Sequence, residues 1–131
     1  MPRLYRRYPT GVCAMLTSAI NSSLSAMHAF STGVHGSAYN LANLNTAGFN
    51  PVSVHYSSGP RSSHGLETGV RPVVSRTVPP MAETTRVFQP SRTDLAREMV
   101  NLAVNQNAFD ANAQVIRASD ELLGGLVDVF V

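Results

Sequence analysis

The sequence predicts a mainly α-helical protein, in which a long N-terminal helix and a long C-terminal helix form an antiparallel hairpin, a coiled coil, with a small β or extended insert. Two observations support this fold class. Near both ends of the chain, apolar residues recur in alternating steps of four and three, the spacing of helices that pack lengthwise. The segment between them, residues 51–90, holds six of the eight prolines and short runs of alternating polarity.

The chain divides into four segments: residues 1–14, 15–50, 51–90 and 91–131. The first lacks helical periodicity and contains three clustered arginines at positions 3, 6 and 7. Its apolar run at 12–16 is shorter than the roughly 7–15 residues of a signal-peptide core. We therefore expect a disordered leader, with Met15 as an alternative start.

The first helix is expected over residues 17–45. Gly33 and Gly36 lie inside it, and each should weaken it by about 1 kcal/mol relative to alanine. We interpret them as points where another helix comes close. Gly48 fits the left-handed position after a helix, and Pro51 prevents its continuation. The expected seam consists of Ile20, Leu24, Met27, Ser31, Val34, Ala38 and Leu41.

The insert contains two candidate strands. Residues 52–56 alternate in polarity, and residues 70–78 form a second run in which Pro72 favours an edge position. We expect a β-hairpin or an extended excursion.

The second helix should begin after a cap at Ser91 or Thr93, with Asp94 in its first turn, and run to about residue 129, a length of about 55 Å. Gly124 and Gly125 should loosen its last turn. Its expected seam is Leu95, Met99, Leu102, Gln106, Phe109, Ala113, Ile116, Asp120, Leu123, Val127 and Phe130.

A second stripe runs along the same helix, roughly 150° away from the seam. It consists of Val104, Ala108, Ala111, Val115, Ala118, Leu122 and Val129. One partner helix cannot cover two nearly opposite apolar faces. The second helix is therefore expected to be sandwiched in an assembly.

Charge and composition argue against several functions. The net charge is +2, every basic residue is arginine, and no basic face with aromatic residues stands out, so nucleic-acid binding is not expected. One cysteine, Cys13, allows no intrachain disulfide. No run reaches the ~18 apolar residues of a membrane span.

No site chemistry is evident in the motifs. His28 and His35 lie about 10 Å apart along one helix, and His55 and His64 have no acidic or cysteine cluster beside them. Neither a nucleophile elbow nor a phosphate loop occurs. We expect no metal, no cofactor and no enzymatic activity.

Two stretches resemble bacterial flagellar axial proteins, the rod, hook and hook-associated proteins. Residues 38–49 are similar to the family signature "N-x-A-N-x-x-T-x-G-[YF]" that ends the N-terminal helix. Residues 94–102, 107–112 and 118–123 resemble the C-terminal helix with its "E-M-V-N-L" start. Ala47 and Phe49 replace the usual Pro and Tyr of the signature. The chain has no room for an extra domain, so the resemblance points to a short proximal-rod protein.

The resemblance implies a structural subunit of the basal-body rod that self-assembles through its terminal helices. Implied partners are copies of itself, other rod proteins and the type III export apparatus, which would deliver it to the periplasmic rod without a cleaved signal peptide. The alternative is a helical-hairpin binding module, such as an export chaperone or adaptor. The candidate signature and assembly residues are Asn40, Asn43, Asn45, Thr46, Gly48, Phe49, Met99, Asn101, Leu102, Phe109, Asn112, Val115, Ile116, Leu122 and Leu123.

Overall fold

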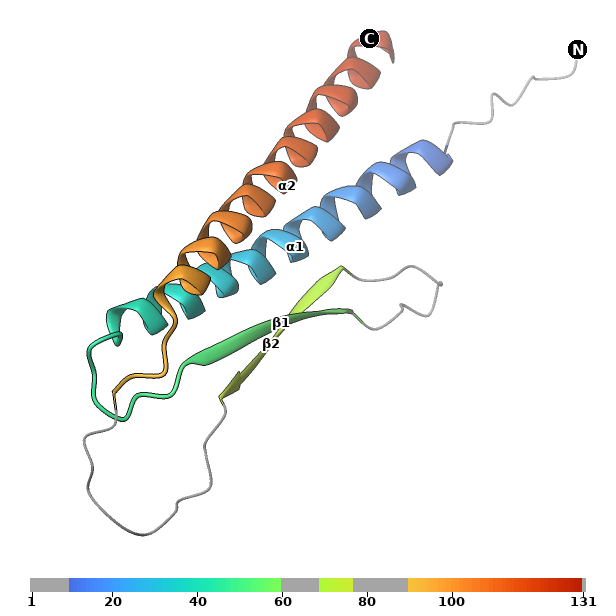
Figure 1. The fold of residues 1–131 in the computed structure, drawn as a ribbon. Helices are drawn as coiled ribbons and strands as arrows, with labels where there is room; N and C mark the ends of the chain where they lie inside the picture. The colour runs from blue at the N-terminus through green and yellow to red at the C-terminus, as the bar shows by residue number, and fades with distance from the viewer. Residues whose placement is uncertain (1–9, 60–68, 77–89, 131) are drawn as a thin grey trace, which may run out of the picture.

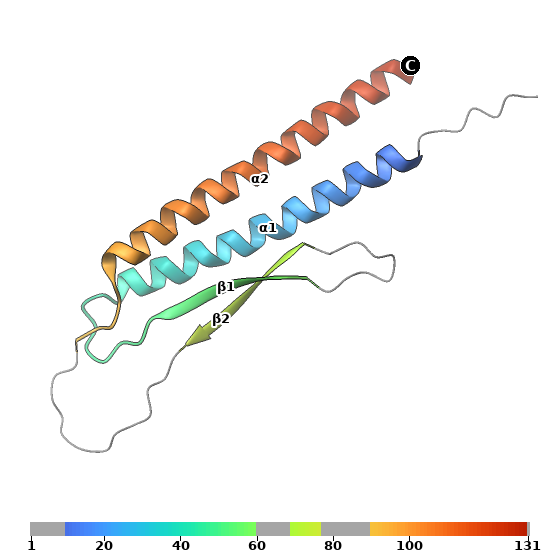
Figure 2. The ribbon, with the colours of Figure 1, turned by 45° about the vertical axis from the view of Figure 1, so that its right-hand side comes forward.

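The computed structural model describes residues 10–59, 69–76 and 90–130. Their elements, in chain order, are α1 (Thr10–Ala42), β1 (Val52–Ser58), β2 (Val70–Arg76) and α2 (Leu95–Phe130). The two helices run side by side in opposite directions, and the strand pair lies along α1 on the side away from α2 (Figures 1 and 2). The mainly helical fold with a small two-stranded sheet agrees with the expected class.

The helix α1 begins and ends earlier than expected. It starts at Thr10, so residues 10–14, assigned to a disordered leader, are helical, and residues 1–9 lie outside the described part. It ends at Ala42, after which residues 43–48 form turns. Gly48 has a φ of 69°, as expected for the left-handed residue after a helix.

The strands pair antiparallel, with Val54 opposite Val74 and Tyr56 opposite Pro72. Both strands are edges, so the missing N–H of Pro72 costs no ladder hydrogen bond in the interior of a sheet. The pair is anchored to α1 where Ser25 Oγ accepts a hydrogen bond of 3.2 Å from the Val70 N–H. Residues 77–78, the end of the expected second strand, lie outside the described residues, as do residues 60–68.

Asp94 caps the helix α2. Its Oδ1 accepts a hydrogen bond of 3.2 Å from the Arg97 N–H, which is the N-cap arrangement that satisfies an orphan donor of the first turn. The expectation of a cap at Ser91 or Thr93 is therefore wrong. Those two hydroxyls instead bond each other at 3.0 Å in the connection before the helix. At the other end, α2 continues through Gly124 and Gly125 without a break.

The interior of the described part is small and polar. Its only buried apolar side chains are Ala26 and Ala29. The other buried residues with polar or charged side chains are Ser23, Ser37, Asn40, Glu98, Asn105 and Ser119. Large apolar side chains lie at the margins of the helix contact or on the outside. The single chain thus buries little of the apolar surface that normally drives folding.

Candidate assembly interface

Asn40 joins three elements near the closed end of the helix pair. Its Nδ2 donates to the Val52 carbonyl oxygen at 2.7 Å and to Glu98 Oε1 at 2.8 Å, and its Oδ1 accepts from the Val52 N–H at 2.7 Å. The side chain is only 1% exposed. Because all its hydrogen-bonding atoms are used, Asn40 fixes the start of β1 and the first turn of α2 against the end of α1.

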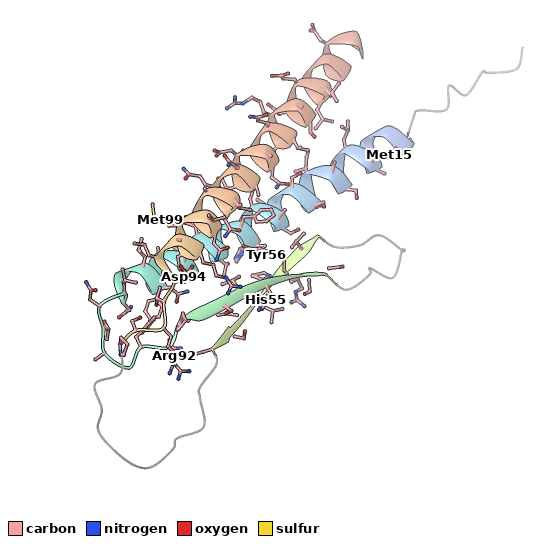
Figure 3. The ribbon with its side chains drawn as sticks, viewed as in Figure 1. Met15, His55, Tyr56, Arg92, Asp94 and Met99 are labelled. Atoms are coloured by element: carbon pink, nitrogen blue, oxygen red, sulfur yellow. The ribbon has the colours of Figure 1, made fainter. Side chains whose placement is uncertain are left out.

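A second junction lies two turns earlier in α1. The Tyr56 hydroxyl of β1 donates to Asn105 Oδ1 of α2, passing over Gly33. The Tyr56 ring meets Phe30 edge-to-face, with centroids 5.1 Å apart. Figure 3 shows Tyr56 directed from β1 toward the helices. Partial burial raises the pKa of the Tyr56 hydroxyl, which favours its protonated, donating form.

The missing side chains of Gly33 and Gly36 let β1 approach α1 closely, and at Gly33 they let α2 approach as well. A Cβ at Gly33 would collide with the Tyr56 hydroxyl and lie 2.8 Å from Asn105 Nδ2. A Cβ at Gly36 would lie 2.7 Å from Val54 Cγ2. We expected another helix to come close at both glycines. At Gly33 both α2 and β1 come close, and at Gly36 the element that comes close is β1.

The signature turn after α1 is tied together by short-range bonds. Asn43 Nδ2 donates to the Tyr39 carbonyl oxygen at 2.9 Å, and Thr46 Oγ1 donates to Asn43 Oδ1 at 3.2 Å. Phe49 packs edge-to-face on Tyr39, with centroids 5.5 Å apart. The Phe49 carbonyl accepts from the Arg92 N–H at 3.2 Å, so the turn also holds the connection to α2. Asn45 is exposed.

The inner face of α2 differs from the expected seam at most of the alternate seam positions. Leu102, Phe109, Ile116 and Leu123 are half-buried, as the seam requires. Of the expected positions between them, Met99, Gln106 and Asp120 are exposed and Ala113 is half-buried; Leu95 is exposed as well. Met99 is 58% exposed and points away from the strands (Figure 3). The alternate positions on the inner face are Glu98, Asn105, Asn112 and Ser119.

The α1 seam is also displaced. Leu24 is 60% exposed and Ala38 is exposed, so neither belongs to the helix contact. Ile20, Met27, Ser31, Val34 and Leu41 are half-buried and form its margin. The buried residues of α1 are Ser23, Ala26, Ala29, Gly33, Ser37 and Asn40. Small side chains occupy these positions because the strands and α2 both approach the helix there.

We call the second stripe of α2 the outer stripe: Val104, Ala108, Ala111, Val115, Ala118 and Leu122; the Val129 side chain is not described. Val104 is 58% exposed, Val115 45% and Leu122 60%. Ala108 alone is half-buried. The outer stripe is thus an apolar face of α2 that the described part of the chain leaves largely exposed.

Two further candidate residues, Asn112 and Asn101, belong to α2. Asn112 is half-buried and donates to the Ala108 carbonyl oxygen at 2.7 Å, within its own helix. Asn101 is exposed and lines a groove of about 350 Å³ between β1 and the start of α2. That groove is also bordered by Arg92, Arg97 and Glu98.

Sequence reasoning missed Glu98, Asn105 and Tyr56. A signal for two of them was present, because Glu98, Asn105, Asn112 and Ser119 recur every seven residues, one place before or after an apolar heptad position. Polar residues that recur every seven positions lie on one face of a helix, and that face can be buried. We placed the seam on the neighbouring positions because we expected apolar residues to be the buried ones.

Within the described ranges, no group of three His, Cys, Asp or Glu side chains is placed to hold a metal ion. His28, His35 and His55 are exposed there, and His64 lies outside the described residues. None of the helices in the described part is long and apolar enough to span a membrane.

These features define a class of protein: a helical subunit with a polar, bonded interior and apolar outer faces. Residues 91–129 match the family described as flagellar basal body rod FlgEFG protein C-terminal. The match supports the resemblance to the flagellar rod proteins over this C-terminal segment, and it singles out no individual rod protein. No curated protein matches the chain.

The family is a structural one, not an enzyme class, and it belongs to the flagellar basal body. The matched segment covers α2 together with the connection that contains Ser91, Thr93 and the Asp94 cap. The partners that this family implies are the other components of the rod.

Proposed function

We propose that the chain is a structural subunit of the bacterial flagellar rod that self-assembles through its two terminal helices. The main support for this proposal is that few apolar side chains are buried in the described part, whereas several large ones are exposed. Two alanines are the buried apolar residues of the described part, whereas Val100, Val104 and Leu122 are each more than half exposed. Contacts between subunits would remove that apolar surface from water, at about 25 cal/mol per Å².

We infer further that α1 and α2 pair as an antiparallel coiled coil. On the inner face of α2, residues 98, 102, 105, 109, 112, 116, 119 and 123 alternate in steps of four and three, and none is fully exposed. In α1, residues 19, 23, 26, 30, 33, 37 and 40 follow the same rhythm. This is the periodicity of helices wound on one another.

The residues of the signature turn serve this role by fixing the hairpin before assembly. Asn40, Asn43, Thr46 and Phe49 hold the end of α1, and Asn40 and Phe49 also bond α2 or its connection. Gly48 supplies the left-handed turn. We assign Asn45, Met99 and Asn101, which are exposed, to contacts between subunits.

The proposal includes delivery by the flagellar type III apparatus, without a cleaved signal peptide, to the periplasmic rod. The test is to delete the gene, restore it with an epitope-tagged copy, and purify basal bodies. The tagged chain should co-purify with the rod, and the deletion should abolish motility. Recovery of the chain only in the cytoplasm, in a stable one-to-one complex with an exported protein, would instead identify a chaperone.

A further inference from the structure

We propose that the outer edge of β1, the edge that does not pair with β2, receives an extended segment of a different rod protein as a third strand. The groove of about 350 Å³ between β1 and the start of α2 is lined by residues 51–56, which include this strand. Its lining also contains the buried Gly33 and Ser37 of α1 and the exposed Asn101 and Val104 of α2. This inference rests on the proposed function as a rod subunit.

The hydrogen bonds of the strand pair show which main-chain groups face the outer edge. The Gly59 N–H donates to the Gly69 carbonyl oxygen at 2.7 Å, and the register of the strands places these two residues opposite each other. In an antiparallel ladder, hydrogen-bonded and non-bonded pairs alternate. The odd-numbered residues of β1 therefore bond β2, whereas the even-numbered ones, among them Val54 and Tyr56, direct their N–H and C=O groups outward.

Two side-chain contacts agree with this alternation. Asn40 bonds both the N–H and the carbonyl oxygen of Val52, and Ser25 Oγ accepts from the Val70 N–H. Both main-chain residues are ones whose groups the alternation directs outward. The Asn40 amide thus takes the place that a residue of a neighbouring strand would take beside Val52, and it marks where a third strand would have to begin.

The two edges of the strand pair differ. On β1, no described residue bonds the outward main-chain groups of Val54 or Tyr56. On β2, two successive outward positions are obstructed, because the Val70 N–H is already bonded and Pro72 has no N–H. Joining β1 of one copy to this stretch of β2 in another copy would leave carbonyl groups of β1 without donors. The difference favours a segment that comes from another protein.

The chemistry of the edge also selects an extended occupant. An extended segment offers free N–H and C=O groups at the spacing of a strand, whereas the main-chain groups of a helix are bonded to one another. The groove is lined by two arginines and two carboxylates, Arg92, Arg97, Asp94 and Glu98. Main-chain bonding, not net charge, therefore recognises the segment, and we expect no proline among the residues that bond β1.

The first test places a proline on either edge. Val54→Pro removes an outward N–H of β1, and Val74→Pro removes the outward N–H of the residue opposite it in β2. Neither N–H belongs to the ladder between the strands, so both variants should keep the strand pair, which amide exchange of the free subunit checks. Basal bodies are purified with photoreactive benzoylphenylalanine in place of the exposed Ser53, irradiated, and analysed by mass spectrometry. Crosslinks to a different rod protein are expected in the parent and with Val74→Pro, and about tenfold fewer with Val54→Pro.

The second test needs no substitution in the strands. In purified rods, the Val54 and Tyr56 amides should exchange hydrogen about a hundredfold more slowly than in the free subunit, and the Val74 amide should not change. Unchanged exchange at Val54 and Tyr56 in a chain that is present in the rod would overturn this inference and leave the proposed function standing. Crosslinks from position 53 that join two copies of the chain would also overturn it. Absence of the chain from purified basal bodies would refute the proposed function and this inference together.

Discussion

At the scale of single residues, Asn40 is the point where α1, β1 and α2 meet. Among the common side chains, only the amides of asparagine and the longer glutamine can donate to both Glu98 and the Val52 carbonyl while accepting from the Val52 N–H. The family signature at this position therefore has a physical meaning within one subunit. An amide is needed because the side chain meets two hydrogen-bond acceptors, Glu98 Oε1 and the Val52 carbonyl oxygen, and one donor, the Val52 N–H.

Asn40→Asp should destabilise the chain by about 3 kcal/mol, because it removes two donors and places a carboxylate beside Glu98. The free energy of unfolding in urea measures the loss. Adding Glu98→Gln should recover part of the stability by restoring a donor. Equal stability of Asn40→Asp and the parent protein at neutral pH would contradict this role.

Glycines in the two helices should respond oppositely to alanine. Gly33→Ala places a Cβ against Tyr56 and Asn105, and we expect a loss of about 2 kcal/mol despite the better helix propensity. Gly124→Ala meets no atom within 4 Å and should gain about 0.5–1 kcal/mol. Thermal unfolding of both variants gives the comparison. A gain at Gly33 as large as that at Gly124 would show that the close approach of Tyr56 is wrong.

At the scale of elements, the sequence identified both helices, both strands and the turn, but placed the helix contacts one residue away from their positions. Periodicity misplaces a face by one residue when the buried positions are polar and their exposed neighbours are apolar. Met99 lies next to Glu98, and Leu24 lies next to Ser23. Apolar residues were assigned inward, whereas this interior is built from serine, alanine, glycine and asparagine because three elements crowd against α1. The strand contacts at Gly33 and Gly36 could not be derived from local pattern at all.

The corrected register of the helices can be tested by crosslinking within one chain. Asn40 faces Glu98, and Gly33 lies against Asn105, so a further seven residues along each helix bring Ala26 opposite Asn112. In a Cys13→Ser background, Ala26→Cys with Asn112→Cys should crosslink within the monomer, as seen by peptide mass spectrometry of dilute protein. Leu24→Cys with Asn112→Cys should not. Efficient crosslinking of the Leu24 pair would restore the seam expected from the sequence.

At the scale of the whole molecule, the protein is an open pair of helices with a strand pair along α1 (Figures 1 and 2). The interior supplies specific hydrogen bonds, at Asn40 and Tyr56, and little apolar burial. The proposed function implies that such a chain gains most of its apolar burial from neighbouring subunits. We therefore expect the outer stripe of α2 to be a contact between subunits in the rod.

The most direct test replaces Val115 and Leu122 together by glutamate and examines purified basal bodies. Both side chains are exposed in the single chain, so the variant should fold and be exported. A charge buried without a partner costs several kcal/mol in each subunit contact, and rod growth should stop. Leu102→Glu is the comparison, since it disturbs the inner face and should lower the stability of the subunit itself. We expect exported protein without complete rods for the Val115/Leu122 variant, and normal rods in that strain would contradict a subunit contact at the outer stripe.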